Sequence, residues 1–275
     1  MENQILKQAL NGDINAFQDL FAQFQPQLKS YLYRLLTDRN DADDLTHDTF
    51  VRAFDKISSF GGQSSLKTWV FQIATNLAYD HLRLRKRWLP SAQDDSKAYS
   101  YENPVVPTTF FEIHQNAPYG SYEIREHIDF CFTCIAKTLP LEQQVALMLK
   151  DVYGFSVIEI GQILTQTEGR IKHLLHDARS TMTGIFANRC ALVSKTGACH
   201  QCSELNGVFN PKQDVQVERM KLAMVRASAD ASQAELYELR AQLVQAIDPL
   251  RTTGTDLHEA IMRCTRKAVG EIETF

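Results

Sequence analysis

The chain has 275 residues, of which 44% are hydrophobic and 23% charged, and its formal net charge is −4. These values are ordinary for a globular protein, and so small a net charge excludes binding to nucleic acid by overall positive charge, so any such surface must be local. Only 12 Gly and 8 Pro argue against a β-sandwich or a disordered chain. We expect neither a secretory signal nor a membrane span, because no basic start precedes an apolar run and no run of about eighteen apolar residues occurs. A cytoplasmic location with reduced cysteines follows as an expectation.

Residues 2–37 carry a helical pattern. Asp13 is suited to cap a helix whose aromatic and aliphatic side chains, Phe17, Leu20 and Phe21, fall on one side. Pro26 lies inside the pattern and predicts a kink or a restart. We interpret the aromatic residues of this region as core.

The next predicted helix, residues 40–57, has carboxylates crowded into its first turns. Acidic residues at a helix N-terminus interact favourably with the helix dipole. One or two would suffice for capping, and this helix has Asp41, Asp43, Asp44 and Asp48. The excess predicts an acidic surface.

Residues 65–87 read as one long helix after a turn at residues 60–64. Ser64 or Ser65 can cap it, and apolar residues recur at three-to-four spacing. Its C-terminal end is basic, with Arg83, Arg85, Lys86 and Arg87. Two interpretations are open for these charges: they complement the helix dipole, or they form a track for a polyanion.

Residues 88–121 are predicted to be a linker. Four prolines interrupt any helical pattern, and the polar residues between them show no periodicity. A stretch this long is uncommon inside a compact domain, so it favours a tether between two domains, with simple disorder as the alternative.

Residues 122–186 predict a second helical domain with helices over 122–137, 141–151, 157–164 and 168–186. Residues 157–182 fit a helix-turn-helix whose turn is 165–167. In the last helix Ile171, Leu174 and Met182 belong to the buried face. The polar side is arranged as a recognition helix requires, with base readers in the middle and phosphate contacts at the edges. The residues that we expect to contact DNA there are Arg170, Lys172, His173, His176 and Arg179.

The C-terminal part, residues 187–275, contains a compact group of thiols and then three amphipathic helical stripes. Cys190, Cys199 and Cys202 are candidate zinc ligands, with redox-active thiols and structural cysteines as the alternatives. Cys131 and Cys134 are also spaced as Cys-x-x-Cys, but they lie at helical spacing among apolar residues and are interpreted as core thiols.

Three motifs resemble region 2 of the extracytoplasmic-function branch of the sigma-70 family of bacterial RNA polymerase subunits. They are Asp41–Leu45 (DADDL), Asp48–Ala53 (DTFVRA) and Thr68–Arg87, which runs from TW to the basic end. The segment 139–179 also resembles region 4 of the same family. The resemblance covers about 10–87 and 122–184, roughly half of the chain.

The resemblance implies an all-α fold of two helical domains joined by a flexible linker, here with a C-terminal helical extension. The implied parts are region 2 over 1–88, a linker over 89–121, region 4 over 122–186 and an extension over 187–275. It implies a sigma factor that directs transcription initiation, with no enzymatic activity and no required cofactor. Its partners would be core RNA polymerase, promoter DNA and an anti-sigma protein. Most members of the family lack such an extension and depend on a separate anti-sigma protein, and we hypothesise that the extension is a built-in regulatory or stabilising module.

The resemblance also assigns residues to three contacts. Core polymerase would contact Asp43, Asp44, Leu45, Asp48 and Phe50. The −10 promoter element would be opened and read, and the upstream phosphates held, by Lys67, Trp69, Asn76, Asp80, Arg83, Arg85, Lys86 and Arg87. The −35 element would contact the recognition helix, although Leu174 and Asp177 stand where the family usually has basic residues.

Two rival functions remain at this point. A stand-alone helix-turn-helix regulator explains residues 157–182 but leaves the acidic and the basic helices unexplained. A metal- or thiol-dependent sensor or enzyme built on the Cys-x-x-Cys pairs lacks a βαβ context, and no Gly-rich phosphate loop or catalytic triad is apparent in the sequence.

Overall fold

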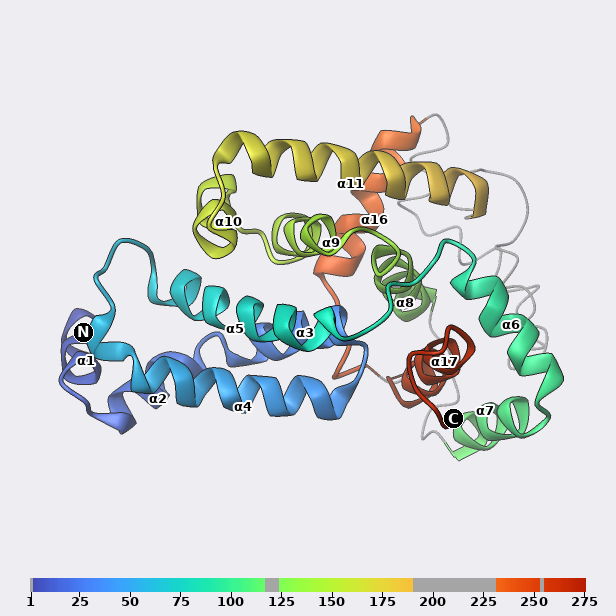
Figure 1. The fold of residues 1–275 in the computed structure, drawn as a ribbon, viewed down its shortest axis with the longest axis horizontal. Coiled ribbons are helices and arrows are strands. Elements are labelled where there is room, and N and C mark those ends of the chain that lie inside the picture. Colours follow the sequence, from blue (N-terminus) through green and yellow to red (C-terminus); the bar gives the residue numbers. More distant parts are fainter. Residues whose placement is uncertain (1, 117–123, 190–230, 253–254) are drawn as a thin grey trace. The chain divides into compact units, whose positions relative to one another are not determined.

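The computed structural model describes residues 2–116, 124–189, 231–252 and 255–275 (Figure 1). All regular elements in these ranges are helices, which confirms the predicted all-α class. The described chain divides into two compact units, Met1–Arg85 with Leu141–Leu175, and Lys86–Pro140 with His176–Phe275. Each unit is a set of residues that contact one another more than they contact the other set. The functional boundaries expected from the sequence stay predictions.

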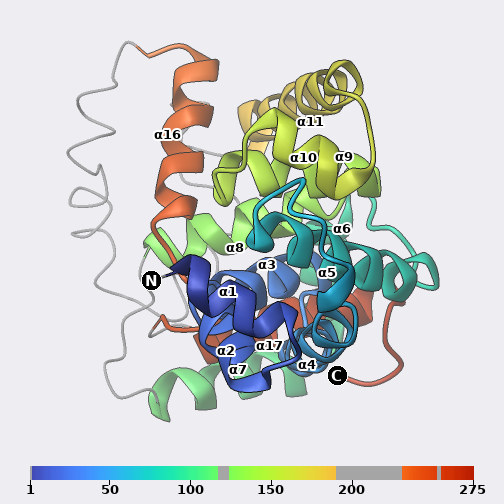
Figure 2. The ribbon, with the colours of Figure 1, turned by 90° about the vertical axis from the view of Figure 1, so that its left-hand side faces the viewer.

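The first unit begins with five helices joined by short turns (Figure 2). They are α1 (Glu2–Leu10), α2 (Ile14–Ala22), α3 (Gln25–Leu36), α4 (Arg39–Asp55) and α5 (Leu66–Arg83), with a short 3-10 helix at Ile57–Ser59 before α5. The Asp13 side chain caps α2 as predicted, accepting from the backbone of Asn15 and Ala16. Pro26 restarts the chain in the first turn of α3, where its missing N–H costs no helical hydrogen bond.

The second half of this unit holds α9 (Leu141–Leu147), a π-helical turn (Met148–Val152), α10 (Val157–Leu164) and the start of α11 (Glu168–Arg189). Buried α3 connects the two halves. The Tyr153 hydroxyl lies 2.6 Å from Arg34 Nη1 and 2.8 Å from Ser30 Oγ. Tyr31 stacks edge-on against the Tyr153 ring, and its hydroxyl is 2.8 Å from Thr75 Oγ1 on α5. Polar groups that are buried in this way are satisfied by one another.

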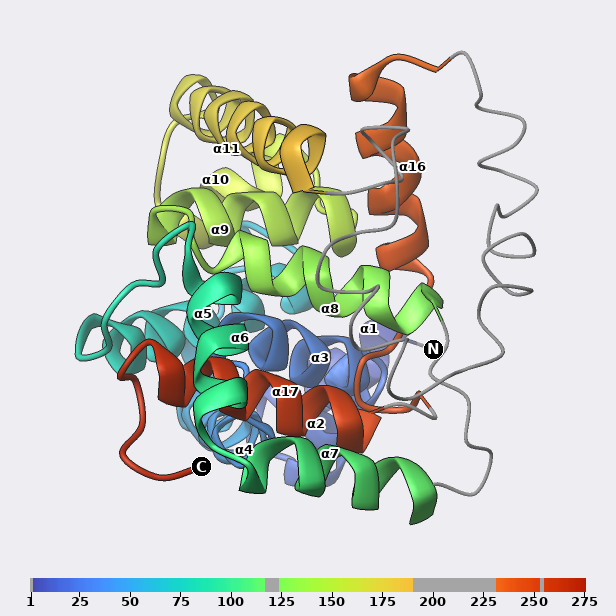
Figure 3. The same cartoon turned by 90° about the vertical axis from the view of Figure 1, so that its right-hand side faces the viewer.

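The second unit contains α6 (Ala92–Glu102), α7 (Val105–Asn116), α8 (Ile124–Ala136), the rest of α11, α16 (Gln233–Gln245) and α17 (Thr255–Ala268) (Figure 3). Its core joins Trp88, Val106 and Phe110 to Ile261 and Met262 of α17. A separate aromatic group is formed by Phe132 of α8, Phe186 of α11 and Tyr237 of α16. Residues from the C-terminal extension therefore complete both clusters.

Two expectations about local structure were wrong. The linker segment contains α6 and α7, because its three described prolines lie before the helices or in a first turn: Pro90 and Pro104 precede them, and Pro107 is the third residue of α7. The long helix expected over 65–87 ends at Arg83, with Leu84 as its C-cap. Apolar residues that would extend its buried face are missing at 85 and 86, where the chain has Arg and Lys.

Candidate polymerase and promoter interface

Helix α4 presents an acidic outer face. The Asp38 side chain caps its N-terminus by accepting from the backbone N–H of Asp41 at 3.0 Å. Asp43, Asp44 and Asp48 lie on the exposed side, and Asp43 pairs with Lys29 of α3. Capping is thus done by a different residue, and three carboxylates are left for a surface that suits a basic partner.

The apolar members of the predicted polymerase contact point the other way. Leu45 is 9% exposed and belongs to the core. Phe50 is half-buried, with its ring centroid 5.3 Å from that of Phe17 and 5.2 Å from that of Phe21. The structure therefore brings the carboxylates together at the surface, buries Leu45 and packs Phe50 against α2, while a docking role for these residues stays a prediction.

The N-terminal end of α5 carries the predicted base-reading aromatic. The Ser65 hydroxyl accepts from the backbone N–H of Thr68 at 3.0 Å and begins the helix. Trp69 is half-buried and leans on Phe60 of the preceding turn, with centroids 5.3 Å apart. Part of one aromatic face thus stays accessible, as stacking on a base would require.

Lys67, next to this tryptophan, is engaged inside the first unit. Its Nζ lies 4.8 Å from the centre of the Phe155 ring. Burial lowers the pKa of this ammonium, and the nearby Glu159 carboxylate opposes the shift. A charge held over a ring in this way is partly desolvated, so Lys67 would have to leave Phe155 to contact DNA.

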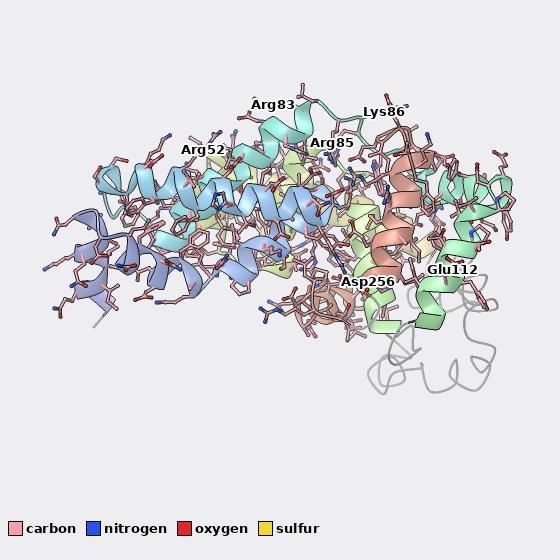
Figure 4. All side chains as sticks on the ribbon, turned by 90° about the horizontal axis from the view of Figure 1, so that it is seen from below. Arg52, Arg83, Arg85, Lys86, Glu112 and Asp256 are labelled. Carbon is pink, nitrogen blue, oxygen red and sulfur yellow. The ribbon has the colours of Figure 1, made fainter. Side chains whose placement is uncertain are left out.

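The remaining predicted −10 residues are spread along α5 and beyond its end. Asn76 and Asp80 are exposed, and Asp80 pairs with Arg83 at 3.2 Å. Figure 4 labels Arg83 on the last turn and Arg85 just beyond it. Arg85 turns back onto Asp41 at 2.7 Å, so two of the four basic residues are already paired with carboxylates in the first unit.

Lys86 and Arg87 belong to the second unit. Lys86 is exposed. Arg87 is half-buried and donates to the carbonyl oxygen of Leu139. Burial lowers the pKa of its guanidinium, and Glu271 opposes the shift. Of this pair only Lys86 is presented as a phosphate contact would need.

The helix-turn-helix has the predicted bounds in α10 and the predicted turn at 165–167. Ser156 and Glu159 form a reciprocal capping box at the start of α10, and Thr165 adopts a left-handed φ of 53° at its end. Gly161 is required by packing, because a Cβ there would lie 2.8 Å from the carbonyl oxygen of Gln166. The glycine lets the turn close tightly onto the first helix of the motif.

Helix α11 shows the predicted division of faces. Ile171, Leu174, Leu175, Ala178 and Met182 are buried. The predicted −35 residues Arg170, Lys172, His173 and His176 are exposed, and Arg179 is half-buried. Arg170 pairs with Glu142 at 3.0 Å, and Lys172 with Glu168 at 4.0 Å. Exposed pairs of this kind are weak, so they leave both cations able to exchange onto phosphate.

A groove between α5 and α10 was missed by the sequence reasoning. Its volume is about 650 Å³, and it is lined by the 60–64 turn, Trp69 and the first residues of the recognition segment, Thr167 and Glu168. Gln72 of α5 donates to the Gln162 carbonyl oxygen at 3.0 Å and lies 3.3 Å from the Thr165 hydroxyl. Trp69 of the predicted −10 surface and the turn of the helix-turn-helix therefore border one groove inside the first unit. In the sequence, only the glutamines in the segments of α5 and α10 indicated a contact between these helices, and glutamines are too common to predict one.

The predicted metal ligands Cys190, Cys199 and Cys202 lie outside the described residues. Within the described ranges no group of three His, Cys, Asp or Glu side chains is placed to hold a metal ion. Cys131, Cys134 and Cys264 are buried thiols outside any disulfide. Burial raises the pKa of the Cys134 thiol to about 12, which suits a core thiol better than a ligand.

Comparisons with known proteins agree with the motifs. Residues 20–88 match the model of sigma-70 region 2. The ECF RNA polymerase sigma factor SigW of Bacillus subtilis is 29% identical over 179 residues, which cover 64% of this chain and 92% of SigW. The chain therefore has a sigma-70 region 2 over residues 20–88 and is similar to extracytoplasmic-function sigma factors over about two thirds of its length.

Two further proteins illustrate the extent of the likeness. The ECF RNA polymerase sigma-E factor of Haemophilus influenzae is 29% identical over 184 residues, which cover 65% of this chain and 94% of that protein. The sigma factor RpoE of Bartonella quintana, solved in complex with the anti-sigma factor NepR, is 22% identical with a TM-score of 0.43 and covers 62% of this chain. About a third of this chain thus lies beyond the alignments with SigW and the sigma-E factor. Among the described helices none is both long and apolar enough to cross a membrane.

Proposed function

We propose that this protein is a promoter-specificity subunit that binds core RNA polymerase in the cytoplasm and directs transcription initiation at promoters with −10 and −35 elements. The observation that carries the proposal is the combination on adjacent helices of an exposed acidic face, Asp43, Asp44 and Asp48 of α4, with the half-exposed Trp69 of α5. A charged rim suits docking to a basic partner, and an accessible aromatic suits a base that is turned out of a duplex.

The roles divide by region. Residues 1–88 would bind polymerase and read the −10 element, with Asn76, Asp80 and Arg83 as further contacts on α5. Residues 122–186 would read the −35 element through α11, and 187–275 would be regulatory. No step of this function is covalent, so neither a catalytic residue nor a cofactor is required. An anti-sigma protein is a further proposed partner.

Binding to core polymerase is the first experiment. Asp44→Arg reverses a charge on the exposed face of α4 and should weaken binding by about tenfold or more, because like charges across an interface are disfavoured. Glu238→Arg makes the same charge change on the exposed side of α16 and is the matched control. Equal affinity of the two variants would contradict the docking role of α4.

Promoter dependence is the second part of the experiment. Lys172→Ala with His173→Ala should reduce transcription from a promoter with a −35 element and leave a promoter without that element unaffected. Duplex binding without any polymerase binding would instead favour the stand-alone regulator, which the observed helix-turn-helix geometry also permits.

A further inference from the structure

The C-terminal helix α17 packs directly onto the segment that connects the two predicted DNA-reading parts. It contacts α6, α7 and α8 of the second unit (Figures 1 and 3). Ile261 and Met262 are 3% and 1% exposed and share a core with Trp88, Val106 and Phe110. Figure 4 labels Asp256 on α17 and Glu112 on α7, which mark these two helices. The connecting segment is therefore folded against the tail.

A buried carboxylate fixes the end of this contact. The Glu271 side chain is 1% exposed, and its Oε2 accepts from the indole N–H of Trp88 at 2.5 Å. Its Oε1 lies 3.5 Å from Lys137 Nζ and 3.6 Å from Arg266 Nε. Lys137 also lies over the Trp88 ring, 4.7 Å from its centre. A buried charge with this set of partners holds its geometry, because losing one partner leaves the others uncompensated.

The connecting segment, residues 92–116, is much shorter as helices than it would be as an extended chain. Residues 92–102 and 105–116 form helices, in which each residue advances about 1.5 Å, against about 3.3 Å in an extended chain. Elements centred at −10 and −35 are about 25 base pairs apart, or roughly 85 Å along B-DNA at 3.4 Å per base pair. In the first unit α5, which carries the predicted −10 residues, is hydrogen-bonded through Gln72 to Gln162 of α10, the first helix of the helix-turn-helix. Reading both elements thus requires α5 and the helix-turn-helix to separate and the connection to lengthen.

We propose that α17 is an intramolecular brake: by clasping α6 and α7 it keeps the connection between the two DNA-reading parts short, and initiation requires its release. The inference rests on the proposed function, because only a protein that reads two separated elements needs the longer connection. It assigns a role to α17, for which the resemblance to region 2 and region 4 gives none.

The closed state can be locked by one substitution that leaves the apolar core and Glu271 in place. The Ser96 hydroxyl of α6 lies 3.6 Å from the Cys264 sulfur of α17. In Ser96→Cys, oxidation by copper phenanthroline would remove one hydrogen from each thiol and join the two sulfurs, which peptide mass spectrometry can verify. The locked protein should still bind core polymerase, since the acidic face of α4 is in the other unit, but it should yield at least about tenfold fewer promoter transcripts, because the competent state is depleted. Reductant should restore them.

The matched controls are the oxidised wild type and Ser96→Cys combined with Cys264→Ser. Both retain the other cysteines but cannot form this bond. Equal transcription by the locked and the reduced forms would overturn the brake. Transcripts absent from every form, the unoxidised wild type included, would count against the proposed function and overturn the brake with it.

Release is tested in the opposite direction with Glu271→Gln, which keeps the shape of the side chain and removes its charge. Hydrogen exchange of residues 92–110 should become faster, and transcription should rise. Asp248→Asn, which removes the partner of Arg251 at 3.5 Å on the same tail, is the control and should change neither. Faster exchange of 92–110 with unchanged transcription would refute the brake. If hydrogen exchange of α8 also becomes faster in Glu271→Gln, the second unit has unfolded. The disulfide lock between residues 96 and 264 then tests the brake by itself.

Discussion

Two internal contacts of this protein differ in the groups that hold them. Between α5 and α10 the contact is made by polar groups: the partly exposed Gln72 reaches Gln162 and Thr165, and the buried Thr68 lies 3.4 Å from Glu159. Between α17 and α6–α7 the contact is a sealed core around Ile261 with a buried carboxylate at Glu271. The first contact joins α5 to the first helix of the helix-turn-helix, and the second joins the tail to the segment that connects the two predicted DNA-reading parts.

The two contacts therefore differ in how much free energy is needed to break them. A hydrogen bond at a wet surface is replaced by one to water, and its net contribution is about 0.5–1.5 kcal/mol. When buried apolar side chains become exposed, the free energy of their burial, about 25 cal/mol per Å², is lost and nothing replaces it. Helices α5 and α10 are thus held together by bonds that DNA or water can replace, although Phe71 and Phe155 beneath them add an aromatic contact at 4.8 Å. Separating α17 from α6 and α7 therefore requires more free energy than separating α5 from α10.

The largest expected effect breaks the sealed contact. Ile261→Ala removes a side chain that is 3% exposed from the middle of α17 and should lower the free energy of unfolding of the second unit by about 2–5 kcal/mol, the usual cost of such a truncation. Urea denaturation followed by hydrogen exchange of α6 and α7 would measure it. Phe111→Ala on α7, where the side chain is 44% exposed, is the control and should cost far less. Equal losses would contradict the assignment of the core.

The first half of the fold was within reach of the sequence. The residue types at Asp13 and Ser65 predicted helix starts, and Pro26 predicted a restart. These predictions were possible because capping and proline geometry depend only on residues nearby in the sequence. The division of α11 into a buried and an exposed face followed from its 3.6-residue period. Such features need no knowledge of what packs against them.

The rest depended on partners far away in the chain. Helices α6 and α7 were read as a linker because the apolar residues that stabilise them come from α17, more than a hundred residues later. The same holds for Glu271, whose role appears only when Trp88 and Lys137 are brought to it. Phe50 and Leu45 looked like surface anchors beside acidic residues, and the neighbouring helices that cover them were invisible in the motif.

A smaller effect is expected at the polar contact. Gln72→Ala removes both bonds to α10 and should change the free energy of unfolding by no more than about 1.5 kcal/mol, because the side chain is partly exposed. Hydrogen exchange of residues 157–166 should nevertheless become faster, since α10 loses a contact with α5. Asn76→Ala, one turn further along α5 and exposed, is the control. Unchanged exchange in Gln72→Ala would show that the aromatic contact alone holds the groove.

The smallest effect is a pH dependence at the start of α10. Burial alone would raise the pKa of Glu159, but hydrogen bonds from Ser156 and Thr68, with the charge of Lys67, lower it from its usual value of 4.5. A carboxyl whose pKa is lower in the folded state adds stability that is complete above the unfolded pKa and is lost as the pH falls through the folded pKa. Glu159→Gln keeps an acceptor for the capping box and removes the charge. Its loss of stability relative to wild type should therefore be constant from pH 7 to about pH 5 and shrink toward pH 3. Urea denaturation at these three values measures it, with Glu168→Gln, exposed on α11, as the control. A difference that grows on acidification would mean that the carboxylate is unfavourable in the fold, and that the contact between α5 and α10 rests on its neutral hydrogen bonds.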